Sequence, residues 1–220
     1  MRDLSQEDQS IKYVKELFAK NSEVQELALA SMESTGKAGQ AVGALEAKML
    51  QFFIKAHSVK SVVEIGCFAG YSTLWMAEAV DNGKVTTIEN NPEHARLAEN
   101  NFKYYQGDTI IELLEGEASS ALEMLSDDGP FDMVFIDANK SGYAKYLDWA
   151  ENNTRPGSII IGDNSFLFGR LGLKENELPP KTSVNQWKAM REFNERLSDE
   201  EKYISMYIPT SEGMTVAIKR

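Results

Sequence analysis

The feature that most constrains the fold is a regular alternation of apolar strand-like runs and helical segments from residue 61 onward. Strands are predicted at 61–65, 84–89, 108–114, 131–137 and 157–162, and helices at 71–80, 92–101, 118–125 and 141–151 lie between them. This alternation, together with dense Val and Ile runs, predicts a parallel sheet with helices on both faces. We therefore expect an α/β, Rossmann-like fold.

The two ends of the chain depart from this alternation. Apolar residues at helical spacing predict three helices before the first strand. After a helix near 184–197, the segments 203–208 and 214–218 flank a turn signal and predict a C-terminal hairpin. No linker divides the 220 residues, so we expect one domain over residues 1–220.

Composition excludes several classes of function. The formal net charge is −11, from 23 Lys and Arg against 34 Asp and Glu, which disfavours a nucleic-acid-binding surface. No apolar run approaches the roughly 20 residues of a membrane helix, and residues 1–8 lack the apolar core of a secretory signal. With Cys67 as the only cysteine, an intrachain disulfide is excluded, so the cytoplasm is the expected location.

A glycine-containing loop follows the first predicted strand. Glu64 ends that strand, and Gly66 and Gly70 allow a tight turn and close approach of a ligand before a helix begins. The spacing is not the G-x-G-x-x-G of dinucleotide-binding proteins, which disfavours a dehydrogenase. Glu89 ends the second strand, where such folds place a carboxylate against ribose hydroxyls. The alternatives are a turn that binds nothing and a solvated acid.

Oxygen-bearing side chains end two later strands. Asp137 is the last residue of the fourth predicted strand, and Asp163 and Asn164 follow the fifth, so all three are expected at the carboxyl edge of the sheet beside the glycine loop. Neighbouring residues in a regular strand point to opposite faces, so Asp163 and Asn164 can share one ion only where the strand has ended, and Gly162 is expected to provide the flexibility for that ending. Two carboxylates and one amide suit Mg²⁺, Mn²⁺ or Ca²⁺. The alternative is that these residues cap turns.

Lys140 lies three residues beyond Asp137. Near a dication and apolar walls, the charged form of a lysine is disfavoured, so this side chain is a candidate proton acceptor. The alternative is a surface lysine in the first turn of helix 141–151, where a cation is poorly placed relative to the helix dipole.

From about Val42 onward the chain resembles the metal-dependent class I O-methyltransferases that include catechol and caffeoyl-CoA O-methyltransferases. The resemblance is carried by VVEIGCFAGYSTLWMA, FDMVFIDANKSGY, IIIGDN and IPTSEGMTVAIK. It implies a seven-stranded, mostly parallel sheet, an N-terminal helical cover over residues 1–40, and a homodimer. It implies S-adenosylmethionine contacts from Val42, Glu64, Gly66, Cys67, Ser72, Glu89, Ala118 and Asp137, metal ligation by Asp137, Asp163 and Asn164, and Lys140 as the base.

The chain departs from the family pattern in two places. Asn139 stands where the family often has an acid, and residues 165–170 replace a segment that commonly contains a tryptophan. Phe166, Phe168 and Trp187 are candidate walls for a flat ring, although aromatic residues at such positions are more often plain core or interface. His57 and His94 receive no role.

The expected reaction is methyl transfer to a hydroxyl of a catechol-like or other small aromatic acceptor, with Mg²⁺ as the first choice of metal. One alternative is a methyltransferase that modifies a protein side chain or a nitrogen without a metal. Another is a non-catalytic S-adenosylmethionine-binding module or assembly subunit.

Overall fold

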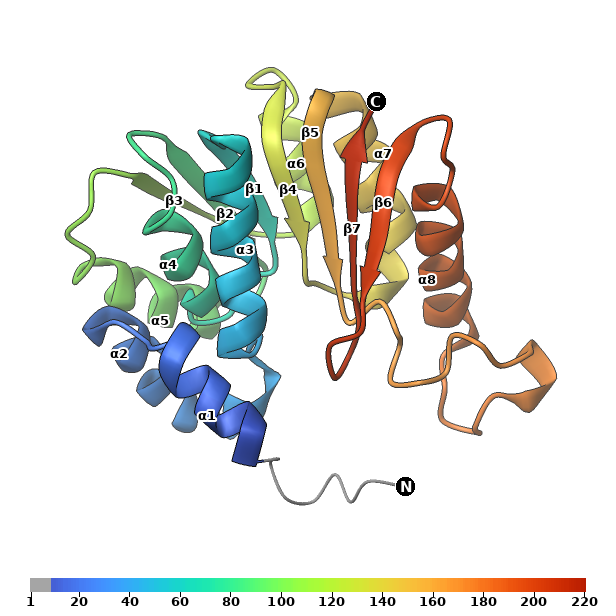
Figure 1. Cartoon of the computed structure of the whole chain (residues 1–220), viewed down its shortest axis with the longest axis horizontal. Coiled ribbons are helices and arrows are strands. Elements are labelled where there is room, and N and C mark those ends of the chain that lie inside the picture. The colour runs from blue at the N-terminus through green and yellow to red at the C-terminus, as the bar shows by residue number, and fades with distance from the viewer. Residues whose placement is uncertain (1–8) are drawn as a thin grey trace.

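The computed structural model describes residues 9–220, which form one seven-stranded sheet with helices on both sides (Figure 1). Residues 1–8 of the expected helical cover lie outside the described residues. The strands are β1 (Ser61–Ile65), β2 (Lys84–Glu89), β3 (Ile110–Glu115), β4 (Phe131–Ile136), β5 (Thr154–Asp163), β6 (Tyr203–Ile208) and β7 (Met214–Lys219). The helices are α1 (Gln9–Phe18), α2 (Glu23–Glu33), α3 (Ala44–His57), α4 (Tyr71–Ala77), α5 (Pro92–Phe102), α6 (Ala118–Leu125), α7 (Tyr143–Asn153) and α8 (Val184–Leu197), with 3₁₀ turns at Ala38–Gln40, Lys140–Gly142 and Glu175–Glu177.

The strand order is β3-β2-β1-β4-β5-β7-β6. The first five strands in this order are parallel, and β7 runs antiparallel to both β5 and β6. The order confirms the predicted Rossmann-like sheet and its C-terminal hairpin. Because the chain moves outward from β1 to β3 and then returns to β4, the direction of winding reverses between β1 and β4. In open α/β sheets, ligands bind at the carboxyl ends of the strands at such a reversal.

Each face of the sheet packs against its own apolar core. Along β4, Met133 and Phe135 belong to the core that contains residues of α2, α3 and α4, whereas Val134 and Ile136 belong to the core under α6, α7 and α8. Successive strand residues point to opposite faces, so a continuous apolar run is what a doubly covered strand requires. The site at the strand ends therefore rests on a support that is buried on both sides.

The observed elements differ from the predicted ones mainly at their ends. The helix expected at 141 begins at Tyr143, because the Asn139 side chain accepts a hydrogen bond from the Ser141 amide at 3.2 Å and caps a 3₁₀ turn. Strand β5 begins at Thr154 and pairs there with Phe131. Among residues 9–220, no helix combines the length and the apolar character that crossing a membrane requires.

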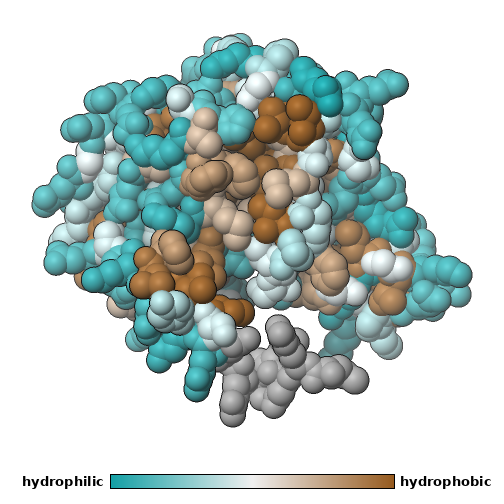
Figure 2. Space-filling view, in the orientation of Figure 1, coloured by the Kyte–Doolittle hydropathy of each residue, from teal (hydrophilic) through white to brown (hydrophobic). Residues whose placement is uncertain are grey.

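Helix α1 contributes no buried residue to either core. Its apolar side chains, which predicted the helix, are instead exposed to solvent, from 36 % for Val14 to 63 % for Phe18. Phe52 on the neighbouring helix α3 is 69 % exposed. Figure 2 shows apolar side chains in this region and also over the strands near the centre of the view. Apolar surface of this kind, gathered over neighbouring elements, is typical of an interface.

Candidate active site

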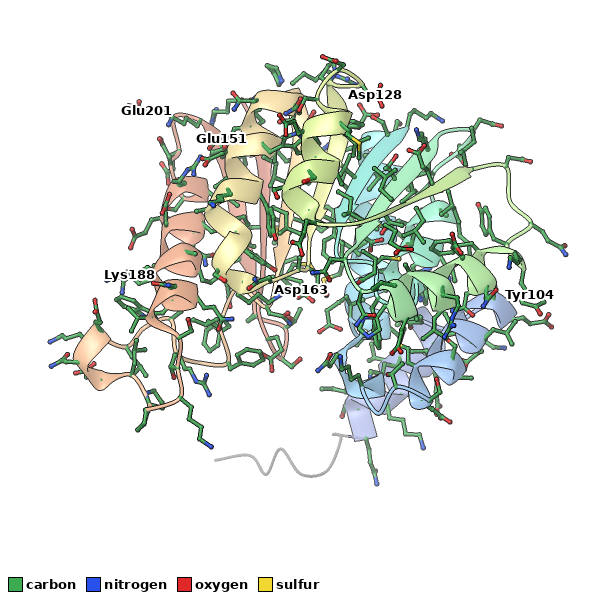
Figure 3. The ribbon with its side chains drawn as sticks, turned by 180° about the vertical axis from the view of Figure 1, so that it is seen from behind. Tyr104, Asp128, Glu151, Asp163, Lys188 and Glu201 are labelled. Atoms are coloured by element: carbon green, nitrogen blue, oxygen red, sulfur yellow. The ribbon has the colours of Figure 1, made fainter. Side chains whose placement is uncertain are left out.

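A cavity of about 680 Å³ lies at the carboxyl edge of the sheet. Figure 3 shows Asp163 at this edge and Asp128, which precedes β4, at the opposite one. The cavity brings together residues from the ends of β1, β2, β4 and β5, as the topology requires. Of the residues that the resemblance assigns to the cofactor, the metal and the base, its lining omits Glu64 and Lys140 and contains Val42, Gly66, Cys67, Ser72, Glu89, Ala118, Asp137, Asp163 and Asn164.

The glycine loop after β1 is in direct contact with the end of β4. Gly66 has a φ of +102°, and a Cβ at this position would lie 2.1 Å from the carbonyl oxygen of Asp137. The Asp137 amide in turn donates to the carbonyl oxygen of Ile65 at 2.9 Å. Only glycine combines this backbone conformation with so close an approach. The loop and the residue that follows β4 are thereby fixed against each other.

Glu64 lies beneath the loop, outside the cavity. Its side chain is fully buried and accepts hydrogen bonds from Ser72 at 2.5 Å, from Thr87 at 2.7 Å and from Thr73. Burial raises the pKa of Glu64 to about 7, against the effect of these hydroxyl groups. In this structure Glu64 therefore joins β1, β2 and the start of α4 from below.

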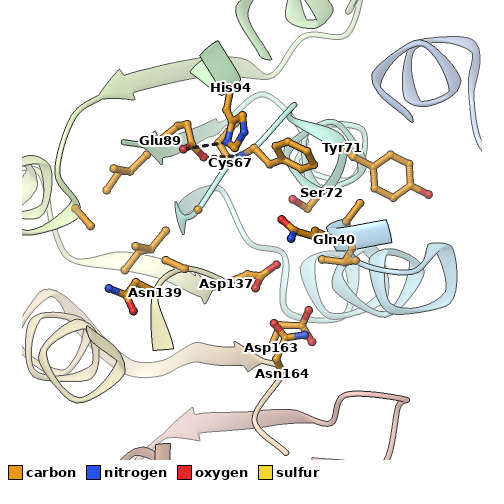
Figure 4. A pocket seen from close by; sticks show the side chains of 18 of the residues that line it. Gln40, Cys67, Tyr71, Ser72, Glu89, His94, Asp137, Asn139, Asp163 and Asn164 are labelled. Carbon is orange, nitrogen blue, oxygen red and sulfur yellow. Dashed lines mark hydrogen bonds and ion pairs between the residues drawn. The ribbon is translucent and has the colours of Figure 1, made fainter. Parts of the chain in front are cut away.

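Glu89 and His94, for which no role was predicted, form one side of the cavity (Figure 4). The two carboxylate oxygens of Glu89 accept hydrogen bonds from the backbone amides of Phe68, at 2.7 Å, and Asn91, at 2.9 Å. His94 Nδ1 lies 3.6 Å from Glu89, and its ring packs edge-on against Phe68 with centroids 4.6 Å apart. The position of His94 in the sequence could have indicated this contact, because His94 lies in the first turn of α5, which begins three residues after Glu89.

The predicted ligands lie across the cavity from Glu89 and His94 (Figure 4). Burial, and then the charge of Asp137, raise the pKa of Asp163 to about 7. A cation between the two carboxylates would relieve both effects. In the described part of the chain, no group of three His, Cys, Asp or Glu residues is arranged to hold a metal. The predicted ligands are the carboxylates of Asp137 and Asp163 and the side-chain amide of Asn164, and such oxygen donors are the ligands that hard cations prefer.

The chain turns away from the direction of strand β5 at Asn164, whereas we expected this turn at Gly162. Gly162 stays in the strand and pairs with Thr215, and a Cβ on it would lie 2.5 Å from the ring of Phe193. Asn164 has a φ of +51°, a left-handed conformation that Asn adopts more readily than most residues. The glycine therefore provides space for packing, and the asparagine makes the turn.

Lys140 lies in the 3₁₀ turn that precedes α7, where its side chain is 12 % exposed. Its Nζ donates to Asp137 Oδ1 at 2.9 Å and to the Tyr143 hydroxyl at 2.9 Å. The lysine is thus held beside a predicted ligand, and the interpretation as a solvated surface lysine does not describe it.

One of the three proposed aromatic walls lines the cavity. Phe168 is part of the lining, whereas Phe166 is 47 % exposed outside it and Trp187 is buried in the core under α8. The turn between β6 and β7 closes this end with Ser211 and Glu212. This turn is held by the amides of residues 165 and 166, which donate to the carbonyl oxygens of residues 213 and 212 at 2.9 Å each.

Comparison with known proteins agrees with this geometry. The O-methyltransferase family model matches residues 15–220. Catechol O-methyltransferase from Niastella koreensis is 34 % identical over 171 residues, which cover 76 % of this chain and 77 % of that protein.

Two solved structures have the same fold and similar sequences. One is the O-methyltransferase TomG from Streptomyces achromogenes, which is involved in tomaymycin synthesis and was solved with S-adenosylmethionine. Its TM-score is 0.86 and its sequence identity is 27 %, and the match covers 100 % of this chain and 99 % of that one. An O-methyltransferase from Bacillus cereus in complex with S-adenosylhomocysteine has a TM-score of 0.85 and 27 % identity, covering 95 % and 96 % of the two chains. The chain therefore belongs to the O-methyltransferase family, as its motifs implied.

Proposed function

We propose that this enzyme transfers a methyl group from S-adenosylmethionine to a hydroxyl of a small aromatic acceptor of the catechol class, with help from a divalent metal and Lys140. The observation that carries the proposal is that one cavity is lined both by the glycine loop and Glu89 and by Asp137, Asp163 and Asn164. A cofactor on the loop and an acceptor near the three oxygen donors would then share one enclosed space. Orientation of this kind supplies much of the rate of a two-substrate reaction.

In this proposal the cofactor would lie along the carboxyl ends of β1 and β2. The Glu89 carboxylate would accept the ribose hydroxyls, as acids at this position do in related folds. Ser72 and Cys67 line the same part of the cavity, and Ala118 lies at the start of α6. The cofactor and its product bound in the Streptomyces and Bacillus structures support this choice.

Asp137, Asp163 and Asn164 would hold the metal, with Mg²⁺ as the first choice and Mn²⁺ or Ca²⁺ as the others. Asp163 is buried and the charge of Asp137 raises its pKa, so a dication between the two carboxylates would stabilise the charged form of Asp163. When bound, the metal supplies positive charge that lowers the pKa of an acceptor hydroxyl. The similarity to catechol O-methyltransferase and the presence of Phe168 in the cavity lining support an acceptor of the catechol class.

Lys140 would remove the acceptor proton. In the balanced step, the hydroxyl proton passes to Nζ of Lys140 while the acceptor oxygen forms a bond to the methyl carbon. The bond between that carbon and the sulfur breaks, and the electron pair stays on sulfur in S-adenosylhomocysteine. The Lys140 side chain is 12 % exposed and its Nζ donates to Asp137 Oδ1, so the amine lies beside a proposed metal ligand.

Removing divalent metal tests the proposal against its metal-independent rival. With S-adenosylmethionine and a panel of catechols, caffeoyl esters, flavonoids and acidic peptides, we expect S-adenosylhomocysteine release from a catechol to fall roughly 10²–10³-fold in EDTA, because the metal contributes several kcal/mol to the barrier. Excess Mg²⁺ should restore it. Turnover that is indifferent to EDTA contradicts the metal-assisted mechanism, and cofactor binding without turnover on any acceptor favours a non-catalytic module.

We also propose that two copies of the chain associate through α1 and the neighbouring exposed side chains, in the cytoplasm. Leu17 and Phe18 on α1 are 56 % and 63 % exposed, and a second copy would bury this face. Sedimentation velocity is expected to give a dimer for the natural chain and a monomer for the double variant Leu17→Glu, Phe18→Glu. A natural chain that sediments as a monomer at micromolar concentration contradicts this proposal.

A further inference from the structure

One buried side chain links both ligand-bearing strand ends to the proposed base. Tyr143 is the first residue of α7 and is fully buried. Its hydroxyl oxygen lies 2.9 Å from the carbonyl oxygen of Ile136, which ends β4, and 2.7 Å from that of Asp163, which ends β5. Lys140 Nζ lies 2.9 Å from the same hydroxyl oxygen.

The chemistry of these groups fixes the direction of each hydrogen bond. Carbonyl oxygens only accept, and a phenol has a single hydrogen to donate. The Tyr143 hydroxyl therefore shares its hydrogen between the two carbonyl oxygens and accepts from Lys140. Burial, together with the charges of Asp137 and Asp163, raises the pKa of Tyr143 well above its ordinary value, so the hydroxyl keeps its hydrogen.

The same directions determine how the lysine nitrogen is oriented. Besides Tyr143, Lys140 Nζ has the carboxylate of Asp137 as an acceptor, at 2.9 Å. Because both groups accept from Nζ, the Asp137 carboxylate and the Tyr143 hydroxyl together fix where the lysine nitrogen lies.

The position of the Tyr143 hydroxyl is set by packing. The Tyr143 ring packs edge-on against the ring of Phe193 on α8, with centroids 5.1 Å apart, within the core that supports the back of the sheet. Phe193 is itself fully buried. A rigid core therefore fixes the point at which the hydroxyl meets Lys140 and the two carbonyl oxygens.

We infer that Tyr143 is a positioning residue for methyl transfer: its hydroxyl holds the Lys140 nitrogen in one orientation relative to the ends of β4 and β5. The inference rests on the proposed function, because it requires Lys140 to be the base. Tyr143 itself does not line the cavity. It acts through Lys140 and need not touch the acceptor.

Tyr143→Phe removes the hydroxyl and keeps the ring against Phe193. We expect kcat for a catechol acceptor to fall roughly 10–100-fold at saturating Mg²⁺, because misplacement of a reacting group by about 1 Å costs on that order. The dissociation constant of S-adenosylmethionine, measured by calorimetry without metal or acceptor, should stay within about twofold. The same titration counts the folded sites, so that kcat is expressed per active site even where the variant folds incompletely.

A double-mutant cycle separates positioning from general loss of structure. In a Lys140→Met background, Tyr143→Phe should lower kcat no further, because the residue it positions is already absent. If the two substitutions lower kcat by independent factors that multiply in the double variant, the inference is overturned but the proposed function is not. The same holds if Tyr143→Phe keeps its full kcat while Lys140→Met is impaired. Undiminished turnover of Lys140→Met overturns the base role in the proposed function and this inference with it.

Tyr203→Phe is the matched control. Tyr203 is also buried, and its hydroxyl donates to Glu151 Oε1 at 2.7 Å, away from the cavity. Loss of this hydroxyl should leave kcat per active site unchanged. A drop in kcat equal to that of Tyr143→Phe would show that losing any buried hydroxyl suffices, and it would overturn the inference.

Discussion

Asp163→Asn is expected to lower metal-dependent turnover by roughly 10³-fold, because it removes one of two carboxylates from the proposed metal site and with it several kcal/mol of charge stabilisation. Asp163 ends β5 and lines the cavity opposite Glu89. The affinity for S-adenosylmethionine should change by less than about threefold, since the residue is proposed to hold the metal only. Initial rates at several Mg²⁺ concentrations, with calorimetry of the cofactor, measure both quantities.

The same variant makes a second, independent prediction for the metal-free protein. The pKa of Asp163 is raised to about 7, so between pH 4 and pH 7 the unfolded chain has lost a proton that the folded protein keeps. The free energy of unfolding must then fall as the pH rises through this window and level off above it. In EDTA at pH 8, Asp163→Asn should avoid this loss, which is on the order of 4 kcal/mol, and melt roughly 8–16 °C higher than the natural chain.

Two comparisons control for other causes. Glu64, whose pKa is also raised to about 7, contributes its own slope to both proteins, so the difference between them isolates Asp163. Asp128→Asn makes the same chemical change on an exposed residue at the opposite edge of the sheet (Figure 3). It should alter neither turnover nor melting. A full rate for Asp163→Asn, or equal melting temperatures in EDTA at pH 8, would contradict the assigned environment.

Lys140→Met is expected to lower kcat roughly 10²–10⁴-fold, the usual contribution of a positioned proton acceptor. Methionine keeps much of the aliphatic stem, so the loss is confined to the amine that contacts Asp137 and Tyr143. Binding of S-adenosylmethionine should be nearly unchanged. Single-turnover measurements with saturating cofactor and Mg²⁺ report the chemical step directly.

Lys145→Met provides the matched control, because Lys145 is an exposed lysine on helix α7, outside the cavity. It should retain the natural rate. If Lys140→Met kept normal turnover across the pH range, its role as the base would be wrong, and the metal alone would have to account for removal of the acceptor proton.

Residues close together in the sequence determined most of what was predictable. Asp137 and Asp163 each follow an apolar run, and parallel strands place their carboxyl ends at one edge whatever the details of packing. Gly66 was identified for the same reason, because a turn from a strand into a helix beside a ligand favours glycine. The strand order and the cavity lining agree with these inferences.

The sequence could not show which side chains meet across the fold. Glu64 was expected at the cofactor and instead lies beneath the loop, because hydroxyl groups 8, 9 and 23 residues away surround its carboxylate. Trp187 lies in the core and not at the cavity, since α8 packs behind the sheet. Tyr143 and His94 gained their contacts from turns whose direction depends on caps at Asn139 and Asn91. Such contacts arise from packing between distant segments, which local patterns do not encode.

The antiparallel hairpin has a consequence for how this enzyme can change over evolution. Ser211 and Glu212, in the turn between β6 and β7, close one end of the cavity, and they belong to a segment that supplies no proposed cofactor contact. Mutations there can reshape the space around the proposed methyl acceptor without touching a proposed cofactor contact. This turn is encoded after all of those contacts, which lie between residues 42 and 137, so new acceptors can be explored at little cost to the old cofactor.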